Sequence, residues 1–468
     1  MPLIRPVPLV PPGELGGVHF IGVGGAGMSG IAALYAALGV PTSGSDQAAS
    51  PTLDALAGAG VRTFVGHDSG HLGSAQTIVV SSAVRETNPE LSEARRRGLR
   101  VWHRSAALGA LMLGHHGVAV SGTHGKTTTS GMVAAVLLAA GADPGYVIGA
   151  PLANSGVSSA LGAGPFVVEA DESDGSFLQY PAEIVVVTNV EADHLDNWRT
   201  DDAYAAGMAE FATGSDVRTV IACLDDPGSR RLVEQLRAEG RAVVGYGTSP
   251  DAEIRVRPLP DLPGNAAELI AADDAGTFTL AVPGAHNVLN ALAAYAVGRE
   301  MGLSGPQLRA ALGAFRGTHR RFEQVADVGG VRIVDDYAHH PTELAATLTA
   351  AREVTTGRIV ACFQPHLFTR TRDYADDFGV SLQGADEVVV MDIYPAREDP
   401  IPGVSGELVA EAARRHVGAD RVHYVPAKTD VPGVLAEIVR PGDLVLTLGA
   451  GDVTGVGPAL ASKLRGRA

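Results

Sequence analysis

The sequence predicts an α/β fold with mostly parallel sheets, divided among several domains. Short apolar runs such as VHFIGVGG (18–25) alternate along the chain with alanine-rich segments of helical length. Continuous apolar strands that alternate with helices indicate parallel sheets covered on both faces. Only 5% of the residues are aromatic, whereas Gly and Ala are abundant, which favours close strand–helix packing over an all-β fold. The 468 residues exceed what one hydrophobic core holds, so two to four domains are expected.

The expected strands fall into three groups, with boundaries near residues 114–116 and 318–324. Residues 251–283 alternate polar and apolar side chains, which predicts antiparallel strands, and 284–302 predict a helix that ends at Gly302. The strand segments are 18–25, 76–84 and 99–105 in the first group, 117–125, 165–174, 183–194, 218–226 and 242–247 in the second, and 331–341, 357–366, 386–395, 421–426 and 443–452 in the third.

The net charge and the cysteines exclude several classes of protein. A formal charge of −16 disfavours nucleic acid and anionic membranes as partners, so a bound anion needs local arginines, backbone N–H groups or a metal. Cys223 and Cys362 lie in separate apolar runs and are expected to be buried reduced thiols. The proline-containing N-terminus lacks the features of a signal peptide, and no apolar run reaches the roughly 20 residues of a membrane span. Together these features predict a cytoplasmic protein.

The segment SGTHGKTTT (121–129) predicts a phosphate-binding loop. It joins an expected strand to an expected helix over 126–140, and Lys126 is the only lysine before Lys428. Backbone N–H groups at a helix start favour phosphate, a lysine supplies a compact charge, and the hydroxyl of Thr127 suits Mg²⁺. Val120 stands where the strict motif has glycine, so this is a shortened variant. An arginine cannot replace a point charge on a four-carbon stem, which explains why the chain keeps a lysine here.

A second glycine loop, GVGGAG (22–27), has the spacing of a dinucleotide fingerprint, and Asp46 stands in the position of the ribose acid. Three interpretations remain open for it: an NAD site, a tight packing turn without a ligand, and a loop for another diphosphate such as that of a nucleotide sugar. Two phosphate loops in one chain favour an enzyme with two phosphorylated ligands.

Two acidic clusters end expected strands of the second group. The first is EADESD (169–174), and the second is the segment VEADHLD (190–196), which includes His194. The carboxyl ends of strands hold ligands in sheets of this type. Because carboxylate oxygens suit a hard cation, we interpret the clusters as a Mg²⁺ site beside the phosphate loop. A role of His194 as a polar anchor of its turn remains the alternative.

Eight motifs in order along residues 18–375 closely resemble the Mur ligase family. They are HFIGVGGAGMSGIA, GTHGKTTT, EADESD, TNVEADHLDNW, PGAHNVLNALAA, GTHRRFE, VDDYAHHPTE and FQPHLFTRT. The resemblance implies a Rossmann-like domain for a UDP-sugar over 1–115, a central P-loop-type ATPase domain over 116–320 and a Rossmann-like domain for an amino acid over 321–468. It implies a cytoplasmic ligase for cell-wall peptidoglycan synthesis, a monomer or homodimer, which uses ATP and Mg²⁺ to join L-alanine to the lactyl carboxylate of UDP-N-acetylmuramate through an acyl phosphate.

Site residues carry over by position, with Lys126, Glu169 and His194 as the catalytic set. The resemblance assigns Gly122, Thr123, His124, Gly125, Lys126, Thr127, Thr128, Asn287, Asn290, Arg321 (or Arg320) and Asp336 to ATP; Thr127, Glu169 and His194 to Mg²⁺; Gly22, Gly24, Gly25, Gly27, Ser45 and Asp46 to the UDP-sugar; and Tyr337, His339, His366 and Arg370 to L-alanine.

One departure and three alternatives accompany the resemblance. The family often has a basic residue after the histidine of FQPH, where this chain has Leu367, which removes one charged contact at the amino acid. A related ligase that recycles a whole murein peptide is the alternative within the family. An NAD-dependent oxidoreductase leaves the second loop unexplained, and a P-loop ATPase without ligation does not account for the histidines and arginine of the third domain.

Overall fold

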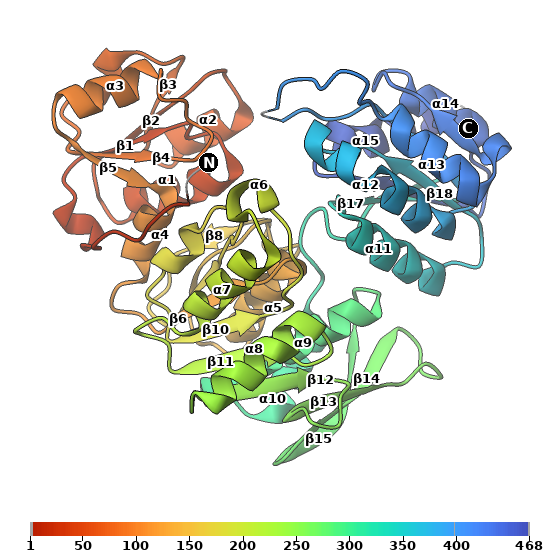
Figure 1. Ribbon diagram of the computed structural model, residues 1–468, viewed down its shortest axis with the longest axis horizontal. Coiled ribbons are helices and arrows are strands. Elements are labelled where there is room, and N and C mark those ends of the chain that lie inside the picture. The colour runs from red at the N-terminus through yellow and green to blue at the C-terminus, as the bar shows by residue number, and fades with distance from the viewer. Residues whose placement is uncertain (1–2, 397, 467–468) are drawn as a thin grey trace. The chain divides into compact units, whose positions relative to one another are not determined.

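The computed structural model describes residues 3–396 and 398–466, and these form two compact units. Unit 1 comprises residues 1–259, 267–278 and 289–315, and unit 2 comprises 260–266, 279–288 and 316–468. Figure 1 shows the sheets and helices of both units. The N-terminal and central sheets therefore share one unit. The division into domains at 115/116 and 320/321 stays a prediction.

The N-terminal sheet of unit 1 is fully parallel, as the apolar runs predicted. Its order places the first strand at the centre, and the direction of strand order reverses between β1 and β4, so that a ligand site is expected at that switch point. The strands in spatial order are β3 (Arg62–Val65), β2 (Thr42–Asp46), β1 (Val18–Ile21), β4 (Thr77–Val80) and β5 (Arg100–His103). The helices are α1 (Ala26–Ala37), α2 (Pro51–Gly58), α3 (Pro89–Arg96) and α4 (Arg104–Met112).

The central sheet has ten strands, and β6 lies between β10 and β9. The antiparallel strands predicted in 251–283 are confirmed where β13 pairs with β14. In spatial order the strands are β15 (Asp274–Leu280), β14 (Asn265–Ala271), β13 (Ile254–Pro258), β12 (Val243–Gly247), β11 (Thr219–Cys223), β10 (Ile184–Val187), β6 (Gly117–Ser121), β9 (Phe166–Glu169), β7 (Gly145–Val147) and β8 (Ser159–Ala160). The helices are α5 (Lys126–Ala139), α6 (Leu195–Trp198), α7 (Asp201–Ala212), α8 (Pro227–Ala238), α9 (Ala285–Glu300) and α10 (Gly305–Ala314).

The sheet of unit 2 is parallel except for the β16–β17 hairpin at one edge. Strand β21 lies between β17 and β18 and runs parallel to both. The loops that follow β17 and β18 therefore start at the same edge of the sheet. The strands in order are β16 (Glu323–Val328), β17 (Val331–Asp336), β21 (Leu444–Leu448), β18 (Ile359–Phe363), β19 (Glu387–Val390) and β20 (Val422–Tyr424). The helices are α11 (Pro341–Val354), α12 (Phe368–Ser381), α13 (Glu407–Val417), α14 (Val431–Ile438) and α15 (Val456–Arg465).

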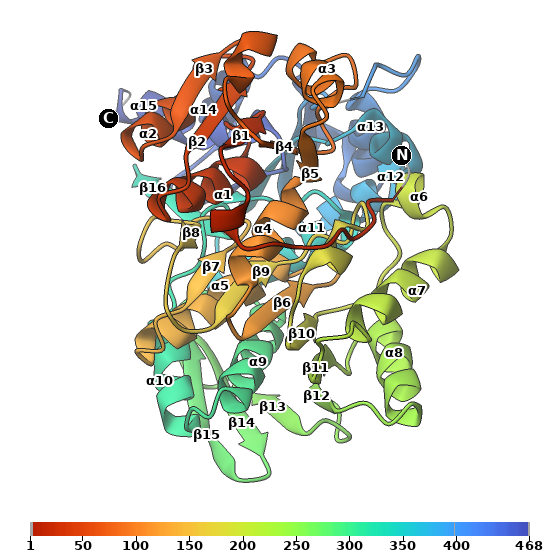
Figure 2. The ribbon, with the colours of Figure 1, turned by 90° about the vertical axis from the view of Figure 1, so that its left-hand side faces the viewer.

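Residues 3–11 form an N-terminal arm, which lies along unit 1 and contains no strand (Figure 2). Its backbone is held by an amide side chain, because the N–H of Val7 donates to Oε1 of Gln179 at 2.7 Å and Nε2 of Gln179 donates back to the Val7 carbonyl at 2.9 Å. The N–H of Ile4 donates to the carbonyl of Asp174 at 2.8 Å. The arm is therefore fixed next to the first acidic cluster.

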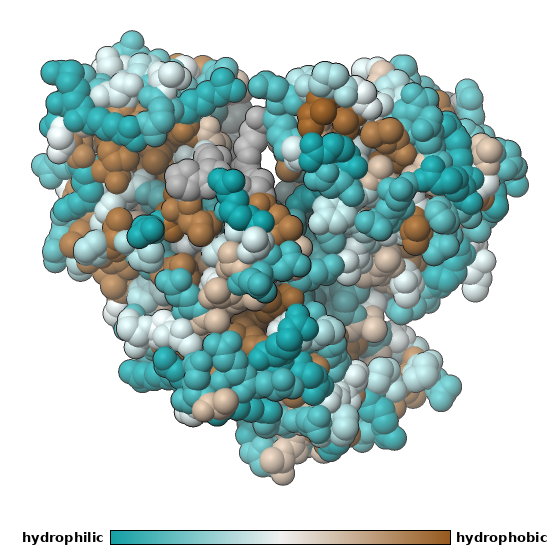
Figure 3. Space-filling view, viewed as in Figure 1, coloured by the Kyte–Doolittle hydropathy of each residue, from teal (hydrophilic) through white to brown (hydrophobic). Residues whose placement is uncertain are grey.

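The cores follow from the strand composition. Strands β6, β10, β18 and β21 are buried along their whole length, and both cysteines are buried free thiols as predicted. Hydrophilic residues cover most of the face in Figure 3, with apolar residues in smaller groups. Among the described residues, no helix combines the length and apolarity needed to cross a membrane.

Candidate functional site

The phosphate loop turns sharply between β6 and α5. Gly122 has φ +129° and Gly125 has φ +81°, a backbone region that favours glycine. A Cβ on Gly122 would lie 2.2 Å from Oγ1 of Thr188, so a side chain does not fit there. Helix α5 begins at Lys126, which leaves the backbone N–H groups of the preceding loop at a helix start, the arrangement that binds phosphate.

Lys126 is held inside this loop by backbone and by a buried carboxylate. Its Nζ donates to the carbonyls of Gly122 at 2.7 Å and Thr123 at 3.1 Å, and lies 2.9 Å from Oε2 of Glu172. Burial acts against the charge, but Glu172 and Asp171 outweigh it and raise the pKa of Lys126. Burial also raises the pKa of Glu172 to about 7, although Lys126 opposes the shift. The lysine is a cation whose present partner is an acid of the first cluster.

Thr127 and Glu169 meet next to Lys126. The Thr127 hydroxyl donates to Oε1 of Glu169 at 3.0 Å, and Oε2 of Glu169 accepts the N–H of Gly149 at 2.7 Å. A hydroxyl and a carboxylate at this distance form the oxygen-rich donor set that Mg²⁺ requires. The predicted ligands on β6–α5 and β9 are thus brought together because β6 and β9 are neighbouring parallel strands.

His194 lies on the other side of the phosphate loop, after β10. Its Nε2 is 3.5 Å from Oδ2 of Asp193 and 3.9 Å from Oε1 of Glu172. The residue has φ +54°, an uncommon conformation for a non-glycine residue and one that clusters at functional sites. The structure therefore brings His194 to the acidic cluster, where the carboxylates of Glu172 and Asp193 add oxygen donors.

The four acids of the first cluster have four different partners. Glu169 contacts Thr127 and Glu172 contacts Lys126, as described above. Asp171 accepts a hydrogen bond from Nη2 of Arg104 at 3.1 Å, and Asp174 accepts the hydroxyl of Ser82 at 2.6 Å. The end of β9 and the loop after it thus place two carboxylates at the phosphate loop, and the other two contact residues of the N-terminal sheet and its helix.

The GVGGAG loop opens into a pocket of about 710 Å³ at the switch point between β1 and β4. The N–H of Gly24 donates to Oδ2 of Asp46 at 2.8 Å, so the predicted ribose acid fixes the glycine loop itself. Of the residues predicted for the UDP-sugar, Gly22, Gly25, Gly27 and Asp46 line the pocket wall. The wall also contains residues that were not predicted, among them Gln47, His67, Ser81, Arg85, Asn88 and Arg104.

Ser45, predicted as a sugar-nucleotide contact, is not on the pocket wall. It is fully buried, and its hydroxyl donates to Oε2 of Glu90 at 2.6 Å. The same hydroxyl lies 3.0 Å from Nδ1 of His67, a residue of the pocket wall, so Ser45 lies behind that wall rather than on it. Burial opposes ionisation of Glu90, but the nearby His19 ring and the hydrogen bonds with Ser45 and His71 outweigh it and lower the pKa of Glu90 to about 2.

The two predicted asparagines lie on α9 and are nearly buried. Asn290 belongs to unit 1 and lies against the phosphate loop, because a Cβ on Gly125 would be 2.8 Å from its Oδ1. Asn287 belongs to unit 2, where its Nδ2 donates to the carbonyl of Pro283 at 2.7 Å. The structure therefore places Asn290 at the loop.

In unit 2 the predicted residues gather at the carboxyl ends of β17 and β18. Asp336 ends β17, and its carboxylate accepts the N–H groups of Phe322 at 2.7 Å and Ala338 at 2.8 Å. Burial raises the pKa of Asp336. Cζ of Arg321 lies 5.0 Å from the centre of the Tyr337 ring. Arg320 contacts Asp335 at 3.1 Å and the Gly449 carbonyl at 2.7 Å, and its Cζ lies 4.8 Å from the centre of the same Tyr337 ring.

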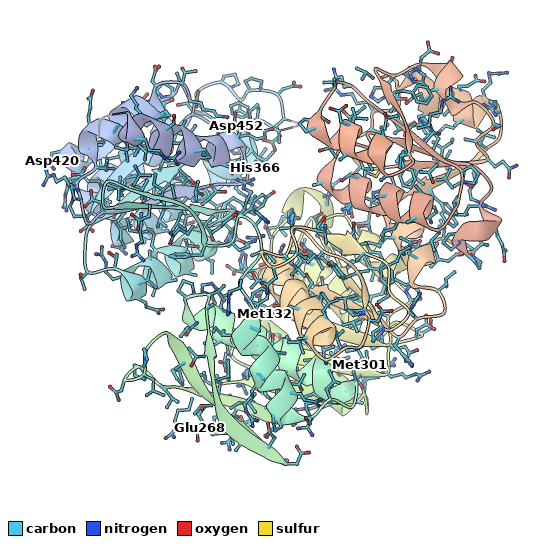
Figure 4. All side chains as sticks on the ribbon, turned by 180° about the vertical axis from the view of Figure 1, so that it is seen from behind. Met132, Glu268, Met301, His366, Asp420 and Asp452 are labelled. Carbon is cyan, nitrogen blue, oxygen red and sulfur yellow. The ribbon has the colours of Figure 1, made fainter. Side chains whose placement is uncertain are left out.

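Aromatic rings connect the two strand ends of unit 2. The ring of His339 is 5.3 Å from Tyr337 and 6.0 Å from His366, and His366 stacks on Tyr394 at 5.8 Å, centre to centre. Figure 4 labels His366 together with Asp452, which accepts Nε2 of Gln364 at 2.8 Å. Leu367, the departure from the family pattern, has φ +71° and its N–H donates to the Tyr394 carbonyl. Arg370 follows, buried on the first turn of α12.

Sequence reasoning missed the role of Arg104, whose contact with Asp171 of the first acidic cluster joins segments from two sheets. It also gave no role to Tyr394, whose ring stacks on that of His366. The available signal was positional, because both residues follow a strand at its carboxyl end.

Comparisons with known proteins cover the chain almost completely. Residues 17–116 match the Mur ligase family catalytic domain, 120–298 the Mur ligase middle domain, and 320–451 the Mur ligase glutamate ligase domain. The chain is 59% identical to the UDP-N-acetylmuramate–L-alanine ligase of Cutibacterium acnes, over 100% of both chains.

Solved structures give the same result. The UDP-N-acetylmuramate–alanine ligase of Thermotoga maritima matches with a TM-score of 0.80 and 27% identity, over 97% of this chain and 100% of that one. A murein peptide ligase of Psychrobacter arcticus matches with a TM-score of 0.71 and 26% identity, over 96% and 98%. The predicted fold class is confirmed, and the chain belongs to the Mur ligase family.

Proposed function

We propose that this chain is an ATP-dependent ligase that joins L-alanine to the lactyl carboxylate of UDP-N-acetylmuramate, with ADP and phosphate as the other products, in peptidoglycan precursor synthesis. The single observation that carries the proposal is the phosphate loop of unit 1, where Lys126, Thr127 and two acids of the first cluster converge. The 59% identity to a ligase of that name supports the choice of substrates.

The first half-reaction is a phosphoryl transfer. ATP lies on residues 122–128, and an oxygen of the lactyl carboxylate attacks the γ-phosphorus, so that the bond to the bridging oxygen breaks and ADP leaves. Lys126 and the backbone N–H groups of the loop hold the terminal phosphates and offset the charge that spreads over the transferred group. Lys126 exchanges its contact with Glu172 for these phosphates. Asn290, beside Gly125, and Asn287 contact the adenine, Arg321 the phosphates and Asp336 the ribose.

Thr127 and Glu169 would hold one Mg²⁺, and His194 would be a ligand of a second. The oxygen atoms of Thr127 and Glu169 fit an ion that prefers oxygen ligands, and Oγ1 and Oε1 lie 3.0 Å apart. When bound, Mg²⁺ supplies charge neutralisation along the triphosphate. The remaining contribution of this chain is positioning, which places the acceptor carboxylate and the γ-phosphate within reach of one another.

The second half-reaction takes place at the acyl phosphate. The amine of L-alanine attacks the carbonyl carbon, and phosphate leaves from the tetrahedral intermediate as the amine loses a proton. Tyr337, His339, His366 and Arg370 of unit 2 form the L-alanine site in this proposal. Arg370 takes the carboxylate of the amino acid, since a guanidinium presents two parallel donors that match a carboxylate.

The decisive experiment measures phosphate release from ATP with each amino acid, with and without UDP-N-acetylmuramate. The proposal expects release that needs both UDP-N-acetylmuramate and L-alanine. Because the chain also resembles murein peptide ligases, one of them named for the tripeptide L-alanyl-γ-D-glutamyl-meso-diaminopimelate, this tripeptide is the second amine substrate to test. Release with the tripeptide and not with L-alanine would assign the recycling reaction instead. Micromolar NAD binding without UDP-sugar binding would contradict a ligase altogether.

A further inference from the structure

Arg104 stands at the carboxyl end of β5 and is the first residue of α4. It lines the pocket of the GVGGAG loop, and its side chain is 22% exposed. Within residues 3–396 and 398–466, the hydrogen bond from Nη2 to Oδ2 of Asp171 is the only one that its side chain makes. A guanidinium has five N–H donors in a rigid fork, so most of the donors of Arg104 are available on the pocket side.

The guanidinium lies directly over the glycine loop. A Cβ on Gly27 would be 3.0 Å from Nη1 of Arg104 and 3.4 Å from Cζ. The third glycine of the fingerprint commonly lets a helix pack against its strand, whereas here it makes room for a charged group. Gly27 is also in the first turn of α1, where the helix dipole contributes partial positive charge. Two positive features therefore face each other, an arrangement that an anion between them would stabilise.

Behind Arg104 the surroundings are negative. Asp171 bonds to it directly, and Glu169 and Asp174 act on its charge from the same loop. A diphosphate on the GVGGAG loop without Arg104 would face these carboxylates with no intervening cation. The pocket wall contains one other arginine, Arg85, and its side chain is exposed. Arg104 is thus the cation placed between the glycine loop and the acids.

We propose that Arg104 binds the diphosphate of the sugar nucleotide, with Nη1 and its neighbouring donors on the phosphates and Nη2 kept on Asp171. The inference rests on the proposed function for the identity of the ligand. Arg104 is a substrate-binding residue for the UDP-sugar, and Asp171 positions it. Because Asp171 belongs to the loop that carries Glu172, the same loop holds the cation of each phosphate site.

Calorimetric titration of UDP and UMP into the full chain tests the proposal, since the two ligands differ by one phosphate. The wild type is expected to bind UDP more tightly than UMP. Arg104→Ala is expected to reduce this advantage by about tenfold or more, while ATP affinity is unchanged. Arg104→Lys is expected to keep part of it, because a lysine retains the charge without the fork. Arg97→Ala, which removes an exposed arginine at the end of α3 that is not on the pocket wall, is the matched control and is expected to have no effect.

Asp171→Asn separates ligand binding from a merely structural ion pair. The amide oxygen of the asparagine can still accept the hydrogen bond from Nη2 and position Arg104. If Arg104 binds the diphosphate, losing only the repelling charge therefore leaves UDP affinity equal or higher. If the pair is only structural, breaking it from either side weakens UDP and UMP alike, and the proposal is wrong. Wild-type affinity in Arg104→Ala would also overturn it. Failure of the wild-type chain to bind UDP or the UDP-sugar at all would contradict the proposed function itself, and melting curves verify that each variant is folded.

Discussion

The two glycine loops of unit 1 obtain their positive charge in different ways. The loop at 122–128 carries Lys126 within its own motif, and the buried carboxylate of Glu172, in the loop after β9, contacts that lysine. The loop at 22–27 contains no cation, and Arg104 reaches it from the far end of the sheet. Both loops follow the first strand of their sheet and precede a long helix. The two loops thus share the same strand–loop–helix backbone, but their positive charge comes from different parts of the chain.

The difference matters for what each loop tolerates. A loop with its own lysine depends on local geometry, since Lys126 bonds to carbonyls of Gly122 and Thr123 inside the loop. A loop that takes its cation from a distant residue depends on how β5 and α4 pack against β4 and α1. Changes within the motif should therefore harm the first loop more than the second.

The largest effect is expected from Lys126. Lys126→Ala, and also Lys126→Arg, should lower kcat/KM by about 100-fold or more, because an interaction with the transferred phosphoryl group is lost and a planar guanidinium does not fit the loop. Circular dichroism should show that the fold is retained. Lys463→Ala, which removes an exposed lysine near the C-terminus, is the control. Near-normal turnover of Lys126→Arg would contradict the explanation that this loop requires a lysine because arginine cannot replace it.

Matched glycine substitutions sharpen the comparison through stability. Gly122→Ala places a Cβ 2.2 Å from Thr188 Oγ1 at a φ of +129°, and should destabilise the chain by about 2–4 kcal/mol. Gly27→Ala meets only the guanidinium of Arg104 at 3.0 Å, and should cost about 1 kcal/mol or less. Urea unfolding of the two variants measures the difference. Equal losses would mean that the two loops are equally constrained.

The buried acid Glu90, near the loop at 22–27, should make the stability of the fold depend on pH. The pKa of Glu90 is lowered from 4.5 to about 2. A lowered carboxyl pKa stabilises the fold above the unfolded pKa, and this contribution is lost as pH falls towards 2. Relative to Glu90→Gln, the wild type should gain about 2 kcal/mol above pH 5, after allowance for screening by solvent.

Urea midpoints between pH 7 and pH 2 test this prediction. The gap between wild type and Glu90→Gln should narrow as the pH falls. Glu14→Gln, on the exposed surface of the same unit, should follow the wild type throughout. A gap that widens in acid would show that Glu90 is protonated in the native state.

The smallest effect concerns the lysine that is absent elsewhere. A carbamate formed on a lysine by CO₂ could help to place a metal ion in the central sheet, but this chain has no lysine between Lys126 and Lys428. Arginine cannot take that role because it stays protonated. Activity at pH 7–8 should therefore not change when bicarbonate and CO₂ are removed. Rescue of a degassed enzyme by bicarbonate would show that a carbamate forms.

What the sequence could predict was set by how local the signals are. The phosphate loop, the acids at the ends of β9 and β10, and the residues after β17 and β18 were all visible as motifs at strand ends. The direction of a side chain was less accessible, so Ser45 was assigned to the ligand edge although the alternation along β2 buries it against Glu90. The role of Arg104 escaped notice because its contact with Asp171 depends on packing between segments far apart in the chain.

The central claim is that the two loops hold two different nucleotides, ATP at 122–128 and the UDP-sugar at 22–27. Calorimetry of Lys126→Ala with ATP and with UDP-N-acetylmuramate, each alone, tests it most directly. The account predicts that ATP affinity falls by about tenfold or more, while UDP-N-acetylmuramate binds as it does to the wild type. Loss of UDP-N-acetylmuramate binding with ATP binding intact would contradict the assignment of both loops.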